Sequence, residues 1–179
     1  MSTARPPEDL DTVIRDVYEP AGMKITDVLR ETESTEYGAC RFRLNGHSVA
    51  FRIAKSTPTK IGQFVTIWKR PTLYAAIAPL DVSDSVDFVV VNVSDTMHHG
   101  QFVFNQKLLV EKGIMSQNSQ GGKLALRIYP PWTKPAARAA IKTQAWQLKQ
   151  FFSLTQIQIT DSAQTHKLLL AQVCALFGL

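Results

Sequence analysis

The fold is decided by the stretch CRFRLNGHSVAFRI, residues 40–53. Apolar residues alternate with polar or small ones on both sides of Asn45-Gly46. Such alternation indicates half-buried strands, and Asn-Gly is typical of a two-residue hairpin turn. This turn would pair Leu44 with His47 and put both apolar rows on one face. The stretch therefore predicts an antiparallel β-hairpin with one face directed at the core.

The same register places Arg41, Arg43 and Arg52 together on the other face of the hairpin. Guanidinium groups this close repel one another unless an anion or carboxylates lie beside them. Phosphate would satisfy them in bidentate geometry, while the alternative is the solvated side of a half-covered sheet. These arginines are the first candidates for binding a phosphate-bearing ligand.

Strand and helix patterns alternate along the rest of the chain. Further strands are expected at 63–70, 88–93, 101–104 and 124–129. Helices are expected at 8–18, 25–30, 107–112, from Thr133 to about Phe152, and from Asp161 to Phe177. The β-branched run 88–93 is typical of a strand buried on both faces. The order predicts one α/β (α+β) domain with a central mixed β-sheet, an N-terminal β-hairpin and flanking helices.

Charge is distributed unevenly along the 179 residues, whose net charge is +5. Residues 1–36 carry −5 and residues 81–104 carry −4. Residues 37–80 carry +7 with no acid at all, and residues 105–150 also carry +7. Residues 151–179 are neutral. If the two basic segments are neighbours in the fold, their combined field favours an anionic partner.

Cysteine usage and hydropathy indicate a cytoplasmic protein. The two cysteines, Cys40 and Cys174, form no Cys-x-x-Cys motif, which favours reduced thiols over a zinc or redox centre. The N-terminus lacks a basic region followed by an apolar one, so no signal peptide is expected. No apolar window reaches about 18 residues, so neither a transmembrane helix nor a membrane partner is expected.

Two further segments carry candidate phosphate contacts. Lys55, Lys60 and Gln63 surround a loop in which Gly62 permits close backbone approach, which suits a phosphodiester, although a polar strand connection would have the same composition. In the helix expected from Thr133, basic residues recur every four positions at Lys134, Arg138 and Lys142, and Lys149 follows seven positions later.

An aromatic side chain, Trp146, lies within this basic stripe. Basic residues with an exposed ring are typical of a nucleic-acid surface, and the alternative is a solvated helix with Trp146 half buried. We expect Ile141, Ala145, Leu148 and Phe152 to form the core-facing stripe.

Catalysis would need more acids than the sequence offers. A nuclease holds Mg²⁺ with two or three carboxylates, usually beside a lysine. Asp87 stands at the start of a buried strand, and Lys55 and Lys107 are the candidate lysines. No second acid has suitable spacing, and Asp87 as a cap of the strand start is the alternative role.

Several blocks of the sequence resemble the bacterial MepB family. These are Tyr37-Gly38, Phe51-Arg52-x-Ala54-Lys55, 57–70, Asp87-Phe88, Gly100-Gln101-Phe102-x-Phe104, Tyr129-Pro-Pro-Trp132 and Lys142-Thr143-Gln144-x-Trp146-Gln147. The resemblance covers about residues 10–152, which divides the chain into a MepB-like domain at 1–152 and a helical extension at 153–179 packed on the same domain. It implies a PD-(D/E)xK nuclease-like fold, similar to restriction endonucleases, and phosphodiester binding or cleavage. Lys107 stands one place later than the lysine of the relatives.

The first functional hypothesis is a nucleic-acid or nucleotide-phosphate binding domain. Its predicted contacts are Arg41, Arg43, Arg52, Lys60, Gln63, Lys69, Arg70, Trp132, Lys142 and Trp146. One alternative is a divergent metal-dependent nuclease that uses Asp87, Lys55 and Lys107, and another is a protein-interaction module with a basic surface. No cofactor is expected, except Mg²⁺ under the nuclease alternative, and the sequence assigns no oligomeric state.

Overall fold

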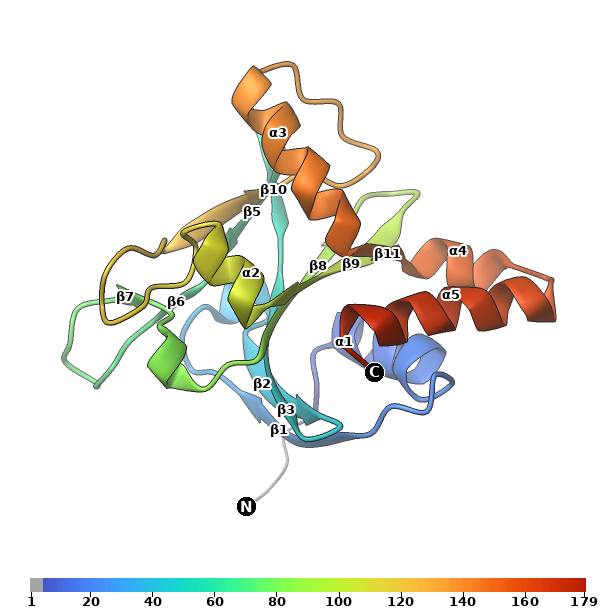
Figure 1. Cartoon of the computed structure of the whole chain (residues 1–179), viewed down its shortest axis with the longest axis horizontal. Coiled ribbons are helices and arrows are strands. Elements are labelled where there is room, and N and C mark those ends of the chain that lie inside the picture. The colour runs from blue at the N-terminus through green and yellow to red at the C-terminus, as the bar shows by residue number, and fades with distance from the viewer. Residues whose placement is uncertain (1–4) are drawn as a thin grey trace.

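The computed structural model describes residues 5–179 (Figure 1). Its centre is a six-stranded mixed sheet in the order β1-β2-β3-β8-β9-β11. These strands are β1 (Ile25–Arg30), β2 (Cys40–Leu44), β3 (His47–Ile53), β8 (Phe88–Ser94), β9 (His99–Asn105) and β11 (Phe151–Ser153). The pairing of β3 with β8 is parallel and the other pairings are antiparallel. The predicted single domain with a central mixed sheet is confirmed.

A second sheet has the order β10-β5-β4, and a short strand pair accompanies it. The strands are β4 (Lys55–Thr57), β5 (Lys60–Thr66) and β10 (Ala125–Ile128), with the pair β6 (Trp68–Lys69) and β7 (Ala78–Pro79). The α-helices are α1 (Glu8–Val13), α2 (Gln106–Glu111), α3 (Arg138–Gln147), α4 (Leu154–Ile159) and α5 (Ala163–Leu176). Shorter helices are the π-helix η1 (Ile14–Tyr18) and the 3-10 helices η2 (Thr35–Tyr37), η3 (Val82–Asp84) and η4 (Leu148–Gln150).

The hairpin of β2 and β3 has the predicted register. Leu44 pairs with His47, and Cys40 pairs with Phe51 at the far end. Asn45 and Gly46 both have positive φ angles, 48° and 86°, as the two central residues of a type I′ turn require. The turn therefore sets the pairing that directs the apolar rows of both strands into one core.

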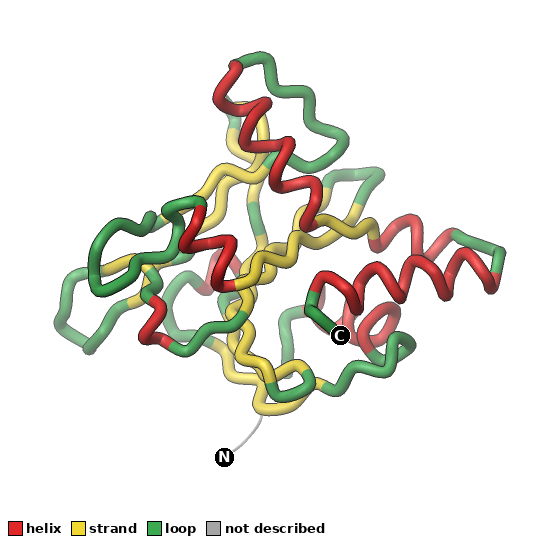
Figure 2. Tube along the Cα trace, viewed as in Figure 1, coloured by secondary structure: helices red, strands yellow, loops and turns green. Residues whose placement is uncertain are grey.

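The central sheet separates two hydrophobic cores, and Figure 2 shows helices on both sides of this sheet. The inward face of the hairpin packs against α1, η1, α4 and α5, while α2, α3 and the second sheet cover the opposite face. β8 contributes to both, because Val90 lies in the first core and Val91 in the second. This confirms the prediction of a strand buried on both faces.

A chain of buried polar groups lies on the α1 side of the sheet. The Tyr18 hydroxyl donates to Gln101 Oε1 at 2.5 Å, and the Gln101 amide donates to Asn92 Oδ1 at 2.6 Å. The Asn92 amide in turn lies 2.9 Å from Nε2 of His99. Burial raises the pKa of Tyr18 and lowers that of His99. Both side chains therefore stay neutral at pH 7. This series of hydrogen bonds connects η1 to the sheet without a buried charge.

The helix predicted over 25–30 is wrong, because this segment is the edge strand β1. Its pairing with β2 shifts register between Thr26 and Leu29, and Asp27 between them has a φ of +55°. Such a bulge interrupts the two-residue period. The segment becomes a strand because it pairs with the free edge of the hairpin. Its own sequence contains no local signal for a strand.

The helix predicted from Thr133 begins later, at Arg138, and ends earlier. The Gln144 amide donates to the carbonyls of Pro130 and Thr133, at 3.1 and 2.7 Å, which holds the preceding segment in a turn. The chain re-enters the central sheet as β11 after η4, where a helix to Phe152 was expected. The final helix also begins one place later, capped by the Ser162 hydroxyl instead of Asp161.

The predicted core stripe of this helix is wrong as well. Ile141 and Leu148 are 48% and 37% exposed, and the buried position is Gln147. The Gln147 amide accepts from the Tyr129 backbone at 2.9 Å and donates to the Arg127 carbonyl at 3.0 Å. Hydrogen bonds of the Gln147 side-chain amide therefore hold α3 against β10. A prediction that uses only the spacing of apolar residues does not detect such contacts.

No helix in the described part of the chain has the length and apolar character needed to cross a bilayer.

Candidate nucleic-acid interface

The arginine face of the hairpin meets carboxylates. Glu31, just beyond β1, accepts from Arg41 Nε at 2.7 Å and from Arg52 Nη2 at 2.5 Å, one on each oxygen. Arg43 lies 3.9 Å from Asp27. Arg52 is only 2% exposed. Two acids of the negatively charged N-terminal segment therefore face the three guanidinium groups, closely at Arg41 and Arg52 and through a longer, exposed contact at Arg43.

The carboxylate of Glu31 offsets the free-energy cost of burying the positive charge of Arg52. Burial lowers the pKa of Arg52, and the charge of Glu31 opposes that shift. A second hydrogen bond goes from Arg52 Nη1 to the Phe51 carbonyl at 2.8 Å, while Nε has no partner among the described residues. Breaking a buried pair of this kind leaves an uncompensated charge in the interior. The pair is therefore an important part of the fold on this side of the sheet.

Two more predicted contacts, Lys69 and Arg70, are also paired with acids. Lys69 Nζ lies 2.5 Å from Asp84, and Arg70 Nε lies 2.6 Å from Glu33. Arg70 also packs on the ring of Trp68, 5.7 Å from its centroid. Together with Arg41 of the hairpin they line a cleft of about 540 Å³. We call it the charge-paired cleft; its lining includes Arg30, Glu31, Glu33, Arg41, Trp68, Lys69 and Arg70.

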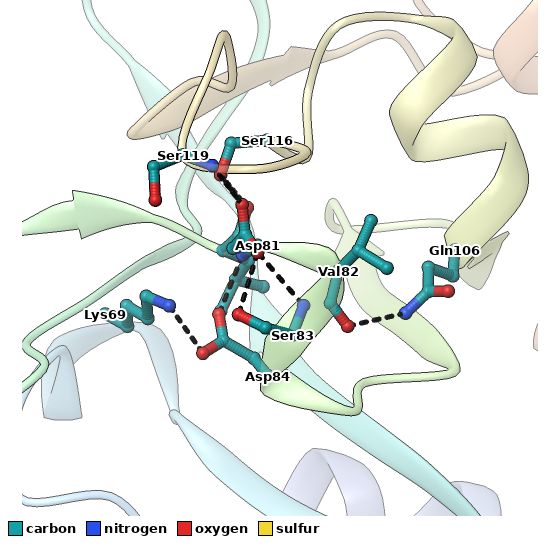
Figure 3. A network of polar contacts seen from close by, with 9 residues as sticks. Lys69, Asp81, Val82, Ser83, Asp84, Gln106, Ser116 and Ser119 are labelled. Atoms are coloured by element: carbon teal, nitrogen blue, oxygen red, sulfur yellow. Dashed lines mark hydrogen bonds and ion pairs between the residues drawn. The ribbon is translucent and has the colours of Figure 1, made fainter.

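Asp84 belongs to a larger polar network, which fixes Lys69 in place (Figure 3). Its other oxygen accepts from the Asp81 backbone at 2.7 Å. The Asp81 carboxylate accepts from Ser83 N at 3.0 Å and from Ser116 Oγ at 2.8 Å. These hydrogen bonds lower the pKa of Asp81. The network joins η3 to the loop after α2, and Lys69 is its outermost member (Figure 3).

The outer face of the second sheet carries cations without acids. Arg127 of β10, Phe64 of β5 and Lys55 of β4 lie opposite one another in a single row across the sheet. The Arg127 guanidinium lies 5.7 Å from the Phe64 ring centroid, and Lys55 Nζ lies 5.3 Å from that of Tyr37. The rings of Tyr37 and Phe64 are 6.2 Å apart. We call these four residues the cation–aromatic row.

The row is held in place by the loop between β4 and β5. Arg127 Nη1 donates to Thr57 Oγ1 at 2.7 Å and to the Gly62 carbonyl at 3.3 Å. Gly62 has a φ of +83°, and a Cβ there would lie 2.8 Å from the Tyr129 ring. A glycine is therefore needed for β5 to pass beneath Tyr129. This preorganises one more aromatic ring beside the row.

The sequence explains why this face has no carboxylate of its own. β4 and β5 come from residues 37–80, and β10 and α3 come from residues 112–160, and neither stretch contains an acid. Across residues 5–179, Lys55, Lys60 and Arg127 make no ion pair. Lys55 and Lys60 are exposed. The face is therefore open to an external anion.

Among the other predicted contacts, Lys142 is exposed on α3, which is fastened to β10. Gln63 is buried, and its amide donates to the Ser94 carbonyl at 2.6 Å. Trp146, expected on an exposed stripe, is half buried with its ring 5.6 Å from that of Phe104. Trp132 stacks on His98 beside a separate cavity.

The candidate catalytic residues are split between the two ends of the central sheet. Asp87 accepts from Ser48 N at 2.8 Å, which is the geometry of a strand-start cap. Lys107 follows β9 at the same end, where the Gln106 N–H donates to the Asp87 carbonyl. Lys55 comes seven residues after Ser48, so on the order of 20 Å separates it from Asp87 along the strands. In the part of the chain that the structure describes, no three His, Cys, Asp or Glu side chains cluster as metal ligands.

Sequence reasoning missed several residues of these two sites, among them Glu31 and Arg127. Arg127 could have been found, because it alternates with the buried Leu126 and Ile128 and therefore faces outward. Glu31 had no such signal, because the segment before it was predicted as a helix and its partners lie 10 and 21 positions away.

Comparisons with known proteins place the chain in a family. The sequence profile of the MepB-like family matches residues 31–153. A solved structure described as the crystal structure of MepB is 35% identical, has a TM-score of 0.68, and aligns over 72% of this chain and 86% of its own. No curated protein matches. The profile match contains the cation–aromatic row and every lining residue of the charge-paired cleft except Arg30, and this chain belongs to the MepB-like family.

Proposed function

We propose that this protein binds single-stranded nucleic acid on the cation–aromatic row. The observation that carries the proposal is the cross-strand alignment of Lys55, Phe64 and Arg127. Cations and aromatic rings alternate there on a face whose strands contain no acid. A face of this kind supplies both attractions that a nucleic-acid strand needs, one for its phosphates and one for its bases.

The chemistry of each group suits one part of the ligand. Lys55, Lys60 and Arg127 would contact phosphates, and such contacts position a strand without reading its sequence. Phe64, Tyr37 and Tyr129 would offer ring surfaces to unpaired bases. In a duplex the bases are stacked on one another, so aromatic side chains meet them mainly in single strands. The proposal therefore names single strands as the ligand.

The charge-paired cleft is a weaker candidate for the same role. Arg41, Arg52, Lys69 and Arg70 already contact carboxylates there, and a phosphate would have to displace those acids. Lys60 and Lys142 remain the predicted contacts that best suit the proposed surface, because both are exposed. The arginines of the hairpin would then serve the fold and not the ligand.

Cleavage on a PD-(D/E)xK-like fold is the second candidate function that the family resemblance suggests. It would require a further carboxylate beside Asp87 to share a Mg²⁺ ion. The Asp87 carboxylate accepts from Ser48 N and lies 3.8 Å from His47 Nδ1. No observation favours cleavage over binding, so the proposed function is binding.

Titration of a labelled single-stranded 20-mer, followed by fluorescence anisotropy at two salt concentrations, tests the proposal. The variant Lys55→Gln/Lys60→Gln should weaken binding about tenfold at low salt and lower the salt slope by about one to two. The matched control Lys24→Gln/Lys167→Gln removes the same charge from exposed positions outside the row. Absence of binding at low salt, or equal losses in both variants, would overturn the proposal.

A further inference from the structure

A second cavity, of about 460 Å³, lies between β11, the loop before α3 and helices α4 and α5. Its walls are largely apolar and include Trp132, Phe151, Ile157 and Leu169. Among the residues that the structure describes, no acidic side chain lines it. This volume falls within the range of small-molecule sites, which combine apolar walls with a few polar groups.

The aromatic wall of this cavity is held rigidly. Trp132 and the His98 ring stack at 4.9 Å with an angle of 11°, and Phe151 meets Trp132 edge-on at 6.0 Å. The carboxylate of Asp95 holds the His98 ring in place, because it lies 2.9 Å from His98 Nδ1. The Phe151 ring lies over Gly100, where any Cβ would collide with it. Planar rings are therefore already set at defined angles before a ligand enters.

Two amide side chains supply the polar groups. Gln156 of α4 and Gln172 of α5 both line the cavity and both are exposed. Within residues 5–179 neither side-chain amide makes a hydrogen bond. An amide presents a donor and an acceptor side by side, the pattern that complements the edge of a nucleobase.

The cavity lies close to the cation–aromatic row along the chain. Tyr129 beside the row and Trp132 in the cavity are joined by a turn, in which the Thr133 N–H donates to the Pro130 carbonyl at 2.9 Å. Three residues span at most about 10 Å between their Cα atoms. Lys134 lies two positions after Trp132, and Lys149 lies two positions before Phe151. Both lysines are exposed. A strand leaving the row toward the cavity would therefore pass chain segments that carry further positive charge.

We propose that this cavity receives one unstacked base of the strand that the cation–aromatic row binds. The inference rests on the proposed function, and it adds a site at which a single base is enclosed. Stacking on an aromatic side chain contributes about 1–3 kcal/mol per base, which corresponds to a range of about fivefold to more than a hundredfold in affinity. Loss of that one base should therefore be measurable against the background of phosphate contacts.

The test uses a series of single-stranded 10-mers in which one abasic nucleotide is moved along the strand. With the wild-type chain, one position should cost about tenfold in affinity when its base is missing. With Trp132→Leu, that cost should disappear while the salt slope stays unchanged, because no phosphate contact is lost. Trp68→Leu is the matched control, because it removes an indole from the charge-paired cleft and should leave the positional cost in place.

The outcomes separate this inference from the proposed function. Binding with the same abasic profile in the wild type and Trp132→Leu would overturn the base site and leave the row intact. Binding of no 10-mer would overturn both. Thermal unfolding shows whether Trp132→Leu is folded; if it is not, Gln172→Ala, a surface change, should reduce the positional cost at least twofold. An unchanged cost in Gln172→Ala would then count against the base site.

Discussion

The charge-paired cleft and the cation–aromatic row both take cations from the acid-free residues 37–80, yet their electrostatics differ. In the cleft, the sheet edge places β1 and its flanking acids next to β2 and β3, so Glu31 and Asp27 reach the arginines. In the row, the neighbouring strand is β10, which comes from another acid-free stretch. The cations of the row therefore stay unpaired because the neighbouring strand brings no carboxylate.

The largest expected effect concerns the cleft. Glu31→Gln should lower the free energy of unfolding by about 3–5 kcal/mol, because it leaves the buried Arg52 without its counter-charge. Urea denaturation measures this change. Glu33→Gln is the control, since its pair with Arg70 is more exposed and should contribute less than about 1 kcal/mol. Equal losses would show that the cleft is an ordinary exposed ion-pair surface.

The next effect concerns the backbone that supports the row. Gly62 and Gly46 have φ angles of +83° and +86°, so alanine should cost about 1 kcal/mol at either position. At Gly62 the added Cβ would also lie 2.7 Å from the Ile128 carbonyl, whereas at Gly46 it meets nothing within 4 Å. Thermal unfolding should therefore show a larger loss for Gly62→Ala than for Gly46→Ala. A reversed order would contradict the close approach of β5 and Tyr129.

The two regions can be compared directly in binding. Lys55→Gln and Arg70→Gln each remove one positive charge, the first from the row and the second from the cleft. Lys55→Gln should weaken binding of a single strand about threefold to tenfold at low salt, and Arg70→Gln less than about twofold. Anisotropy titrations of both variants under identical salt give the ratio. A stronger effect of Arg70→Gln would indicate that the ligand binds in the charge-paired cleft instead of on the row.

The smallest effect is a pH dependence in the network behind Lys69. Hydrogen bonds from Ser83, Ser116 and Ser119 lower the pKa of Asp81 in the folded state. Its contribution to stability is therefore present above the unfolded pKa of about 4 and is lost as the pH falls below it. Asp81→Asn should flatten the decline of stability between about pH 5 and pH 2. Urea unfolding at several pH values tests this, and an unchanged slope would contradict it.

Local patterns predicted the strands more faithfully than the ends of the helices. The Asn45-Gly46 hairpin and the buried strand β8 were both foreseen, because alternation and turn chemistry act within a few residues. β1 was missed because its strand character depends on pairing with β2. The start of α3 was missed because Gln144 holds the preceding turn from inside the helix.

The predictions about the candidate site also divide into features set by neighbouring residues and features set by contacts between distant parts of the sequence. The hairpin register and the acid-free stretches can be predicted from the order of residues alone. Only the tertiary structure decided which cations remain unpaired, because an ion pair depends on a few ångströms between residues such as Glu31 and Arg52 that are 21 positions apart. Coulomb energy depends on distance in space and on burial, and neither quantity can be read from the order of residues alone.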